Sequence, residues 1–374
     1  MKHLSPISRC RSAVLFLAGI LAGCTAAPDT GYKMIVGAYT EQAAGEGVCV
    51  YEMNVKTGDA RQLSVGKAVN PSYVALSPDK RFVYAVNESG DRSAVSAFSF
   101  DPHAGTLQER QTVPTPDVDP CYLAVTDRHV VTAGYGSGSI AVFERRADGS
   151  LGSARQVIRH TGSSGDTAHR QTPHVHQTIF TPDGRHLLSC DLGTDRITVY
   201  RYNAFDTASI LTVTGSLELK KGSGPRHLAF NAAGDRAYVL QELDGTLTVL
   251  SVHPDASLSV LQETTVANGD GGNGAAAIHL SPDGRFVYAT NRGTADNITC
   301  FSVATDGRLE RAAQVATGGR GPRDFAITRD GRYLLVANQR SDLITVFKRN
   351  KKTGTLTPAG MEIKTGAPVC IVTF

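Results

Sequence analysis

One short pattern recurs along this chain at intervals of about fifty residues. Clear copies occupy residues 77–87, 181–191 and 281–291, and each places a Pro-Asp turn before a short alternating strand pattern. Looser copies follow Asn231 and Thr328, and a degraded copy follows Thr126. The copies start at residues 77, 126, 181, 231, 281 and 328, so the intervals are 49, 55, 50, 50 and 47 residues. A period of this length, built from short strands and turns, predicts a β-propeller.

Each repeat predicts four strands. In the copy that starts at Ser281, residues 277–280 form a first strand, and Pro282-Asp283-Gly284 forms a tight turn. Alternating apolar residues then predict a second strand at 286–290 and a third at 298–303, followed by a fourth that ends near Ala316.

The six repeats cover residues 70–365 and leave one piece at each end of the chain. Residues 33–63 supply strands at the N-terminus, and residues 368–374 supply one strand at the C-terminus. Together they predict a seventh blade that closes the ring and removes exposed strand edges. The expected fold is therefore an all-β, seven-bladed β-propeller of four-stranded antiparallel blades, with a single domain at residues 33–374.

The N-terminus predicts export. Basic residues precede an apolar run at 13–22, which is too short to span a bilayer and ends in Leu21-Ala22-Gly23-Cys24. That tetrapeptide resembles a bacterial lipoprotein box, in which the cysteine is lipidated. We expect a signal peptide at residues 1–23, a tether at 24–32 and a membrane anchor through Cys24. The expected location is the cell envelope, facing the periplasm, and the outer membrane if the cell is Gram-negative.

The charge balance gives no support to a polyanion-binding role. The chain has 38 Lys and Arg and 35 Asp and Glu, and residues 1–23 hold three of the basic residues and none of the acidic ones. Cleavage before Cys24 would leave 35 of each, so we expect no nucleic-acid partner. Five cysteines follow Cys24 without close spacing, which is a poor disulfide framework, and we expect most of them to be buried in strands.

Two sets of loops are expected to meet at one mouth of the propeller channel. We call the loop before each first strand the leading loop, and the loop after each second strand the following loop. In an antiparallel blade both lie at the same end, and the first strand of a propeller blade is innermost. This mouth is the expected place for a ligand.

Aligning the leading loops by counting back five residues from each turn start brings several polar residues into register. The aligned residues are Ser72, Cys121, His176, Arg226, Ala276 and Arg323. Two of them lie in matching Gly-Pro-Arg motifs, Gly224-Pro225-Arg226 and Gly321-Pro322-Arg323. Eleven residues after each turn start, the following loops carry Glu88, Leu192, Glu242, Arg292 and Gln339. Arginines in such loops can also serve as structural ties, but ties need no shared register.

At these residues the chain resembles the bacterial lactonase family of seven-bladed propellers, which includes a 6-phosphogluconolactonase and fungal carboxy-muconate cyclases. The resemblance covers residues 33–374. The matching segments are Asn70-Pro71-Ser72-Tyr73, Pro173-His174-Val175-His176, Asp191-Leu192-Gly193-Thr194-Asp195-Arg196, Gly224-Pro225-Arg226-His227, Gln241-Glu242-Leu243, Asn291-Arg292 and Gly321-Pro322-Arg323.

The resemblance implies a metal-independent site that opens a sugar-acid lactone without a cofactor, and a small anionic lactone as substrate. It places the catalytic roles on His176, Arg226, Glu242 and Arg323. Glu242 or His176 would be the base or acid, and Arg226 and Arg323 would hold the oxyanion or an anionic group of the substrate. The residues expected to contact substrate are His174, His227, Arg292 and Asp191, although His174 could instead orient His176 and Asp191 could instead cap its loop.

The export signal disagrees with the best-known activity of that family, because 6-phosphogluconolactone is a cytoplasmic metabolite. Another sugar lactone or another anionic compound could be the substrate. The alternative function is a non-catalytic envelope propeller that binds or scaffolds other molecules. A quinone- or metal-dependent dehydrogenase is poorly supported, because the chain has no tryptophan and no His-Glu-x-x-His. A serine hydrolase is poorly supported because the chain has no Gly-x-Ser-x-Gly.

Overall fold

The computed structural model describes residues 1, 3, 31–41, 43–164, 172–267 and 274–374. Apart from residues 1 and 3, the predicted signal peptide lies outside the described residues, as do the predicted lipidation site Cys24 and residues 25–30 of the predicted tether. In the described part of the chain, no helix is long and apolar enough to cross a membrane.

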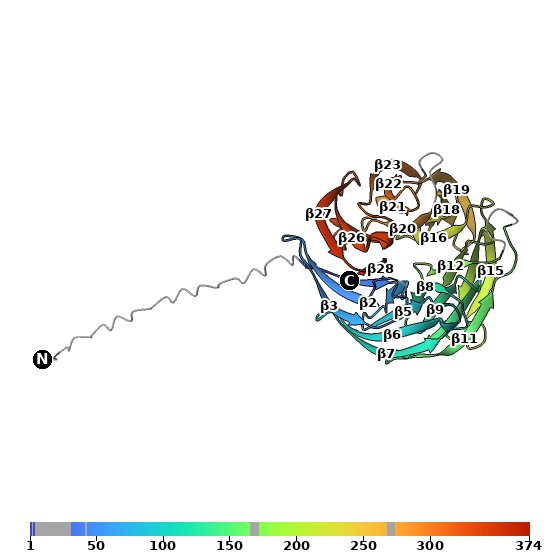
Figure 1. Cartoon of the computed structure of the whole chain (residues 1–374), viewed down its shortest axis with the longest axis horizontal. Coiled ribbons are helices and arrows are strands. Elements are labelled where there is room, and N and C mark those ends of the chain that lie inside the picture. Colours follow the sequence, from blue (N-terminus) through green and yellow to red (C-terminus); the bar gives the residue numbers. More distant parts are fainter. Residues whose placement is uncertain (2, 4–30, 42, 165–171, 268–273) are drawn as a thin grey trace. The chain divides into compact units, whose positions relative to one another are not determined.

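Residues 31–374 form seven four-stranded antiparallel sheets, arranged in a ring as the blades of a propeller (Figure 1). Blade 1 contains β4 (Tyr73–Leu76), β5 (Phe82–Asn87), β6 (Ala94–Asp101) and β7 (Thr106–Pro114), and blade 2 contains β8 (Pro120–Val125), β9 (His129–Gly134), β10 (Ser139–Arg145) and β11 (Leu151–Arg159). Blade 3 contains β12 (Val175–Phe180), β13 (His186–Asp191), β14 (Arg196–Tyr202) and β15 (Leu211–Glu218), and blade 4 contains β16 (Pro225–Phe230), β17 (Arg236–Gln241), β18 (Thr246–Val252) and β19 (Leu258–Thr265).

The last two repeats and the two chain ends complete the ring. Blade 5 contains β20 (Ala275–Leu280), β21 (Phe286–Asn291), β22 (Asn297–Val303) and β23 (Leu309–Ala316), and blade 6 contains β24 (Pro322–Ile327), β25 (Tyr333–Asn338), β26 (Leu343–Arg349) and β27 (Leu356–Lys364). Blade 7 contains β28 (Pro368–Thr373), β1 (Gly31–Ala38), β2 (Val48–Asn54) and β3 (Ala60–Gly66). Two short 3₁₀ helices, η1 (Gly90–Arg92) and η2 (Gln339–Ser341), lie in following loops. The predicted seven-bladed fold is confirmed.

The two ends of the chain pair inside blade 7, as the sequence predicts. Strand β28 pairs antiparallel with β1, with Met34 opposite Thr373 and Gly37 opposite Cys370. Strand β1 begins at Gly31, two residues before the expected start of the propeller. The innermost strand of this blade therefore comes from the C-terminus, and its three outer strands come from the N-terminus.

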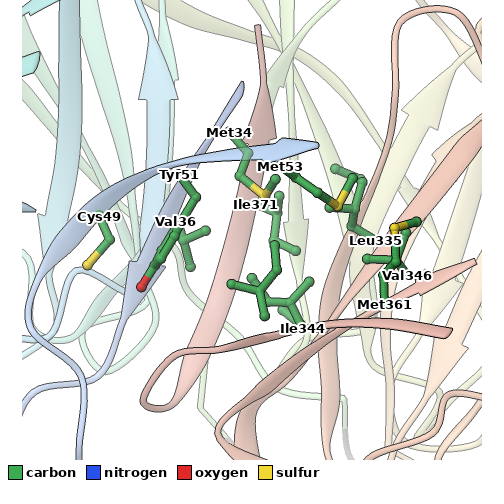
Figure 2. Close-up of a cluster of buried hydrophobic side chains, with 13 residues drawn as sticks. Met34, Val36, Cys49, Tyr51, Met53, Leu335, Ile344, Val346, Met361 and Ile371 are labelled. Atoms are coloured by element: carbon green, nitrogen blue, oxygen red, sulfur yellow. The ribbon is translucent and has the colours of Figure 1, made fainter. Parts of the chain in front are cut away.

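Hydrophobic contacts join every blade to its neighbours. The described residues form seven buried clusters, and each cluster combines side chains from two adjacent blades. Figure 2 shows the cluster between blades 6 and 7, where Met34 and Met53 from the N-terminal strands lie with Leu335 and Ile344. Each buried side chain of this size contributes roughly 1.5–3 kcal/mol of stability. The five described cysteines are free and buried, as expected.

Polar latches join blades at the end of the ring opposite the leading loops. In the turn between β20 and β21, Asp283 accepts hydrogen bonds from its own turn and pairs with Arg349 of blade 6, whose Nη2 lies 3.2 Å from Oδ1 of Asp283. Nε of Arg349 also donates to the hydroxyl of Tyr288, at 2.9 Å. Asp79, Arg145 and Tyr84 repeat the arrangement between blades 1 and 2. The Pro-Asp turn of the repeat thus contributes to inter-blade contact as well as to turn geometry.

We predict that Arg349→Met lowers the free energy of unfolding by roughly 2–4 kcal/mol. The guanidinium is fully buried, so its removal leaves the phenol of Tyr288 and the carboxylate of Asp283 without their shared partner. Asp283 is 33 % exposed, so solvent offsets part of the loss. The measurement is equilibrium urea unfolding, with Arg285→Met as control because Arg285 is exposed beside the same turn. Equal effects of the two substitutions would contradict the latch.

Candidate active site

A β-bulge marks the start of the first strand in the blades that carry the predicted site residues. In blade 4, Pro225 pairs with Gln241 and His227 pairs with Leu240, so Arg226 is an extra residue without a partner. The same shift leaves out His176 in β12, Arg323 in β24 and Cys121 in β8. A bulge redirects the side chain of the extra residue. These four residues, which the sequence alignment placed in register, are therefore the extra residues of the bulges.

Aspartates from preceding blades hold the two Gly-Pro-Arg leading loops. Asp195 accepts hydrogen bonds from the backbone N–H of Gly224 at 2.8 Å and of Gly222 at 2.6 Å, and Asp296 accepts one from Gly321 at 2.8 Å. Both aspartates have positive φ, which Asp tolerates better than most residues. Gly224 has φ of 67°, and a Cβ there would lie 2.7 Å from Leu243. These ties fix the backbone from which Arg226 and Arg323 extend.

Arg226, Glu242 and Arg292 form a charged cluster between blades 4 and 5. Oε2 of Glu242 lies 2.8 Å from Nε of Arg226 and 3.1 Å from Nη2 of Arg292. The Nε–H of Arg226 is not aligned with that oxygen as a hydrogen bond requires. Nη1 of Arg226 instead donates to the backbone oxygen of Ala276, and Nε of Arg292 donates to that of Gly274 at 2.8 Å. Two guanidinium groups therefore share one carboxylate.

The charges of this cluster set the protonation of its members. Burial acts to raise the pKa of Glu242, but Arg292, Arg226 and Arg323 outweigh it and lower that pKa below its usual 4.5. Burial lowers the pKa of Arg292 to about 10, with Glu242 opposing the change. At neutral pH the cluster therefore holds two cations and one anion, an excess of one positive charge.

Arg323 extends into the site from blade 6, and its guanidinium makes fewer polar contacts than that of Arg226. Its Nη2 lies 3.9 Å from Oε2 of Glu88, beyond hydrogen-bond distance, and its guanidinium lies 5.4 Å from the ring centroid of Tyr39. Among the described residues, its guanidinium has no hydrogen-bond acceptor, although its side chain is only 16 % exposed. A buried guanidinium with free donors is well suited to bind an oxyanion or a carboxylate.

His176 supplies a neutral imidazole near these cations. The residue is 4 % exposed, and its ring centroid lies 5.0 Å from that of His227. Burial, with the nearby charges of Arg226, His227 and Arg323, holds its pKa well below 6.5. Its Nδ1 is buried and has no hydrogen-bond partner in the described part of the structure. Because buried polar atoms are normally paired, this atom points to a ligand or a water molecule.

The remaining predicted residues occupy different places. His174 contacts the backbone oxygen of Tyr135 through Nδ1 at 2.8 Å and packs on the Tyr135 ring. Asp191 is fully buried and accepts hydrogen bonds from the backbone N–H of Gly193 in its own loop and of His174 in the leading loop, and it lies 2.7 Å from Nδ1 of His160. Asp191 therefore ties these two loops together, and His174 lies against Tyr135 instead of in the charged cluster.

His227 faces a separate cavity of about 330 Å³ that the first strands of five blades line. Its ring lies edge-on to those of Tyr73 and Tyr122, which stack on each other at 3.9 Å. Its Nε2 also lies 3.4 Å from Nη1 of Arg226. His227 thus contacts Arg226 of the charged cluster, and it also lines the cavity beside Tyr73 and Tyr122.

Sequence reasoning aligned Glu88 without giving it a role and missed Tyr39. The hydroxyl of Tyr39 donates to Oε2 of Glu88 at 2.8 Å, and both residues lie beside Arg323. Tyr39 directly follows β1, just as Glu88 follows β5, Glu242 follows β17 and Arg292 follows β21. Extending the alignment of following loops into the closing blade would have found Tyr39.

The arrangement combines anion binding with a neutral base. Cationic groups from three blades, an unpaired imidazole nitrogen and an ionised carboxylate can activate water and stabilise a developing oxyanion. Within the described residues, no group of three or more His, Cys, Asp or Glu is placed to hold a metal ion.

Comparison with known proteins gives one consistent result. The family model "Lactonase, 7-bladed beta-propeller" matches residues 33–373. The 6-phosphogluconolactonase of Bacillus subtilis is 33 % identical over 355 residues, with 91 % of this chain and 98 % of that protein covered.

Solved structures agree. The periplasmic gluconolactonase of Pseudomonas aeruginosa is 34 % identical with a TM-score of 0.87, over 92 % of this chain and 99 % of that one. A candidate 6-phosphogluconolactonase of Bacteroides fragilis is 40 % identical with a TM-score of 0.88, over 92 % and 98 % of the two chains.

Proposed function

Because the chain belongs to the lactonase family of seven-bladed β-propellers, we propose that it hydrolyses a sugar-acid lactone at the mouth formed by its leading and following loops. The observation that carries the proposal is the meeting of His176, Arg226, Glu242 and Arg323 from blades 3, 4 and 6, each cationic or imidazole member lying on a β-bulge. The relatives named as 6-phosphogluconolactonase and gluconolactonase act on lactones of sugar acids, which supports this substrate class.

The geometry favours His176 as the base. Its Nδ1 is neutral and unpaired, whereas two arginines occupy Glu242 and weaken its basicity. In the proposed reaction, His176 takes a proton from water while the water oxygen bonds to the lactone carbonyl carbon. The ring C–O bond then breaks, and the protonated His176 returns the proton to the leaving oxygen. The products are a carboxylic acid and a hydroxyl group on one open chain.

Arg323 stabilises the oxyanion in this scheme because its donors are free. The Arg226–Glu242–Arg292 cluster supplies an excess of one positive charge in the same site. Removal of one such donor typically lowers a rate by about 10²–10³-fold. The net positive charge also suits a small anionic lactone or the carboxylate product. We propose that no metal ion takes part, since side chains supply both the base and the oxyanion partner.

The proposed site should hydrolyse simple sugar lactones without a metal ion. Wild-type protein starting at Thr25 should hydrolyse D-glucono-δ-lactone or 6-phosphoglucono-δ-lactone above the spontaneous rate, with no change on adding EDTA. Arg226→Ala and Glu242→Gln should each lower kcat/KM by at least about 100-fold. The first removes the excess positive charge of the cluster, and the second leaves two buried guanidinium groups without their shared carboxylate. The measurement is continuous pH-indicator titration of acid release.

Arg201→Ala is the matched control, since Arg201 is exposed and pairs with His186, at the opposite end of blade 3 from His176. Full activity in Arg226→Ala would contradict the assignment. Absence of turnover by wild type would favour the alternative function, a non-catalytic envelope module that binds or scaffolds other molecules.

The proposed role of His176 as the base sets how kcat/KM depends on pH. A base with a lowered pKa stays unprotonated to lower pH, so activity should persist as pH falls through 6.5 and decline only below it. Glu242 adds no loss in that range, since its pKa lies below 4.5. The measurement is kcat/KM against pH, corrected for spontaneous hydrolysis. An acid limb with its midpoint at or above 6.5 would exclude His176 as the base.

We further propose that Cys24 is lipidated and holds the propeller at the periplasmic side of the envelope. The support is the sequence of the first 24 residues, together with a similar protein that is named as periplasmic. Metabolic labelling with an alkyne fatty acid should mark the wild-type protein and not Cys24→Ser. Equal labelling of the two proteins would contradict this proposal.

A further inference from the structure

The mouth has a second acidic residue that the reaction scheme does not use. Glu88 follows β5 of blade 1, and its Oε2 lies 3.9 Å from Nη2 of Arg323. Burial raises the pKa of the Cys121 thiol, and the charges of Glu88, Arg226, Arg323 and Glu242 also influence that pKa. Glu88 therefore belongs to the site, although no step of hydrolysis needs it.

The backbone and one side chain hold Glu88 in a fixed position. Its N–H donates to the backbone oxygen of Asn70 at 3.1 Å, and its own backbone oxygen accepts from Nδ2 of Asn70 at 3.0 Å. The hydroxyl of Tyr39 donates to Oε2 at 2.8 Å. Tyr39 comes from the blade that closes the ring, so closure and placement of Glu88 are linked.

The carboxylate nevertheless keeps unused acceptor capacity. Its side chain is 21 % exposed, Arg323 lies 3.9 Å from Oε2, and no described residue donates a hydrogen bond to Oε1. A carboxylate can accept about four hydrogen bonds, and here one is made. A ligand group at this position must be a donor, because a phosphate or carboxylate would meet a like charge.

We propose that Glu88 accepts a hydrogen bond from a hydroxyl group of the substrate, and that Tyr39 is the positioning residue that orients it. The inference rests on the proposed lactonase function and orients the lactone in the site, with its hydroxyl-bearing side toward Glu88 and Tyr39. A site built to bind a hydroxyl discriminates strongly against an analogue without it, because its polar group is then left unpaired.

The test compares two lactones that differ in hydroxyl groups, D-glucono-δ-lactone and δ-valerolactone. Wild-type protein should prefer gluconolactone, and Glu88→Ala should reduce the ratio of the two kcat/KM values at least tenfold, mainly through a higher KM for gluconolactone. Tyr39→Phe should raise that KM by a smaller factor with kcat little changed. A role of Tyr39 in folding alone would lower the melting temperature and leave KM as it was.

Glu109→Ala is the matched control. Glu109 is an exposed carboxylate on β7, the outer strand of the same blade, so its removal should leave the lactone ratio unchanged. A ratio in Glu88→Ala equal to that of wild type, in a protein that hydrolyses both lactones, overturns this inference and leaves the proposed function standing.

If wild type hydrolyses neither lactone, the proposed function fails separately. The inference is then decided by calorimetric titration with gluconate, which carries the same hydroxyl groups. Weaker binding by Glu88→Ala than by wild type and Glu109→Ala supports a hydroxyl-binding role. Equal binding by all three proteins overturns it.

Discussion

The pairing of β28 with β1 is the constraint on which the site depends. It joins the C-terminal strand to the N-terminal strands within one blade, and the hydrophobic clusters then continue without interruption around the ring. Closure fixes the distance between blade 6, which carries Arg323, and blade 1, which carries Glu88. It also brings Tyr39 between them. Without closure, these three side chains would not lie close together and their charges would not interact.

Within the closed ring, two backbone devices create the site. The β-bulges free one residue at the start of a first strand, and the aspartate ties hold the loop before it. Their combined effect is to fix the backbone from which the buried side chains of Arg226 and Arg323 extend. Such rigidity is what oxyanion stabilisation requires, because the charges need no rearrangement during the reaction.

The two arginines differ in their hydrogen bonds, which supports different proposed roles. Arg226 is committed to the backbone of blade 5 and to Glu242, whereas Arg323 keeps its donors free of described partners. The same reasoning separates the acids and bases. Glu242 is neutralised by arginines, while His176 has an unpaired nitrogen in a setting that keeps it neutral. Sequence alone left the roles of His176 and Glu242 open.

The repeat predicted the blade count, the closing blade and the convergence of aligned residues, because these follow from a shared register. It could not show which aligned side chains meet across the ring. Glu88 was aligned but remained without a role, since its partners Tyr39 and Arg323 come from blades 7 and 6. Asp191 was uncertain for a related reason, since its burial and its contact with His160 depend on loop packing.

The central claim is that the bulge residues form one substrate site at this mouth. A crystal structure with gluconate, the product of glucono-δ-lactone hydrolysis, tests it most directly. The account predicts that the gluconate carboxylate lies against Arg323, within reach of Nδ1 of His176. Gluconate in the cavity lined by Tyr73 and Tyr122, with none beside Arg323, would contradict it.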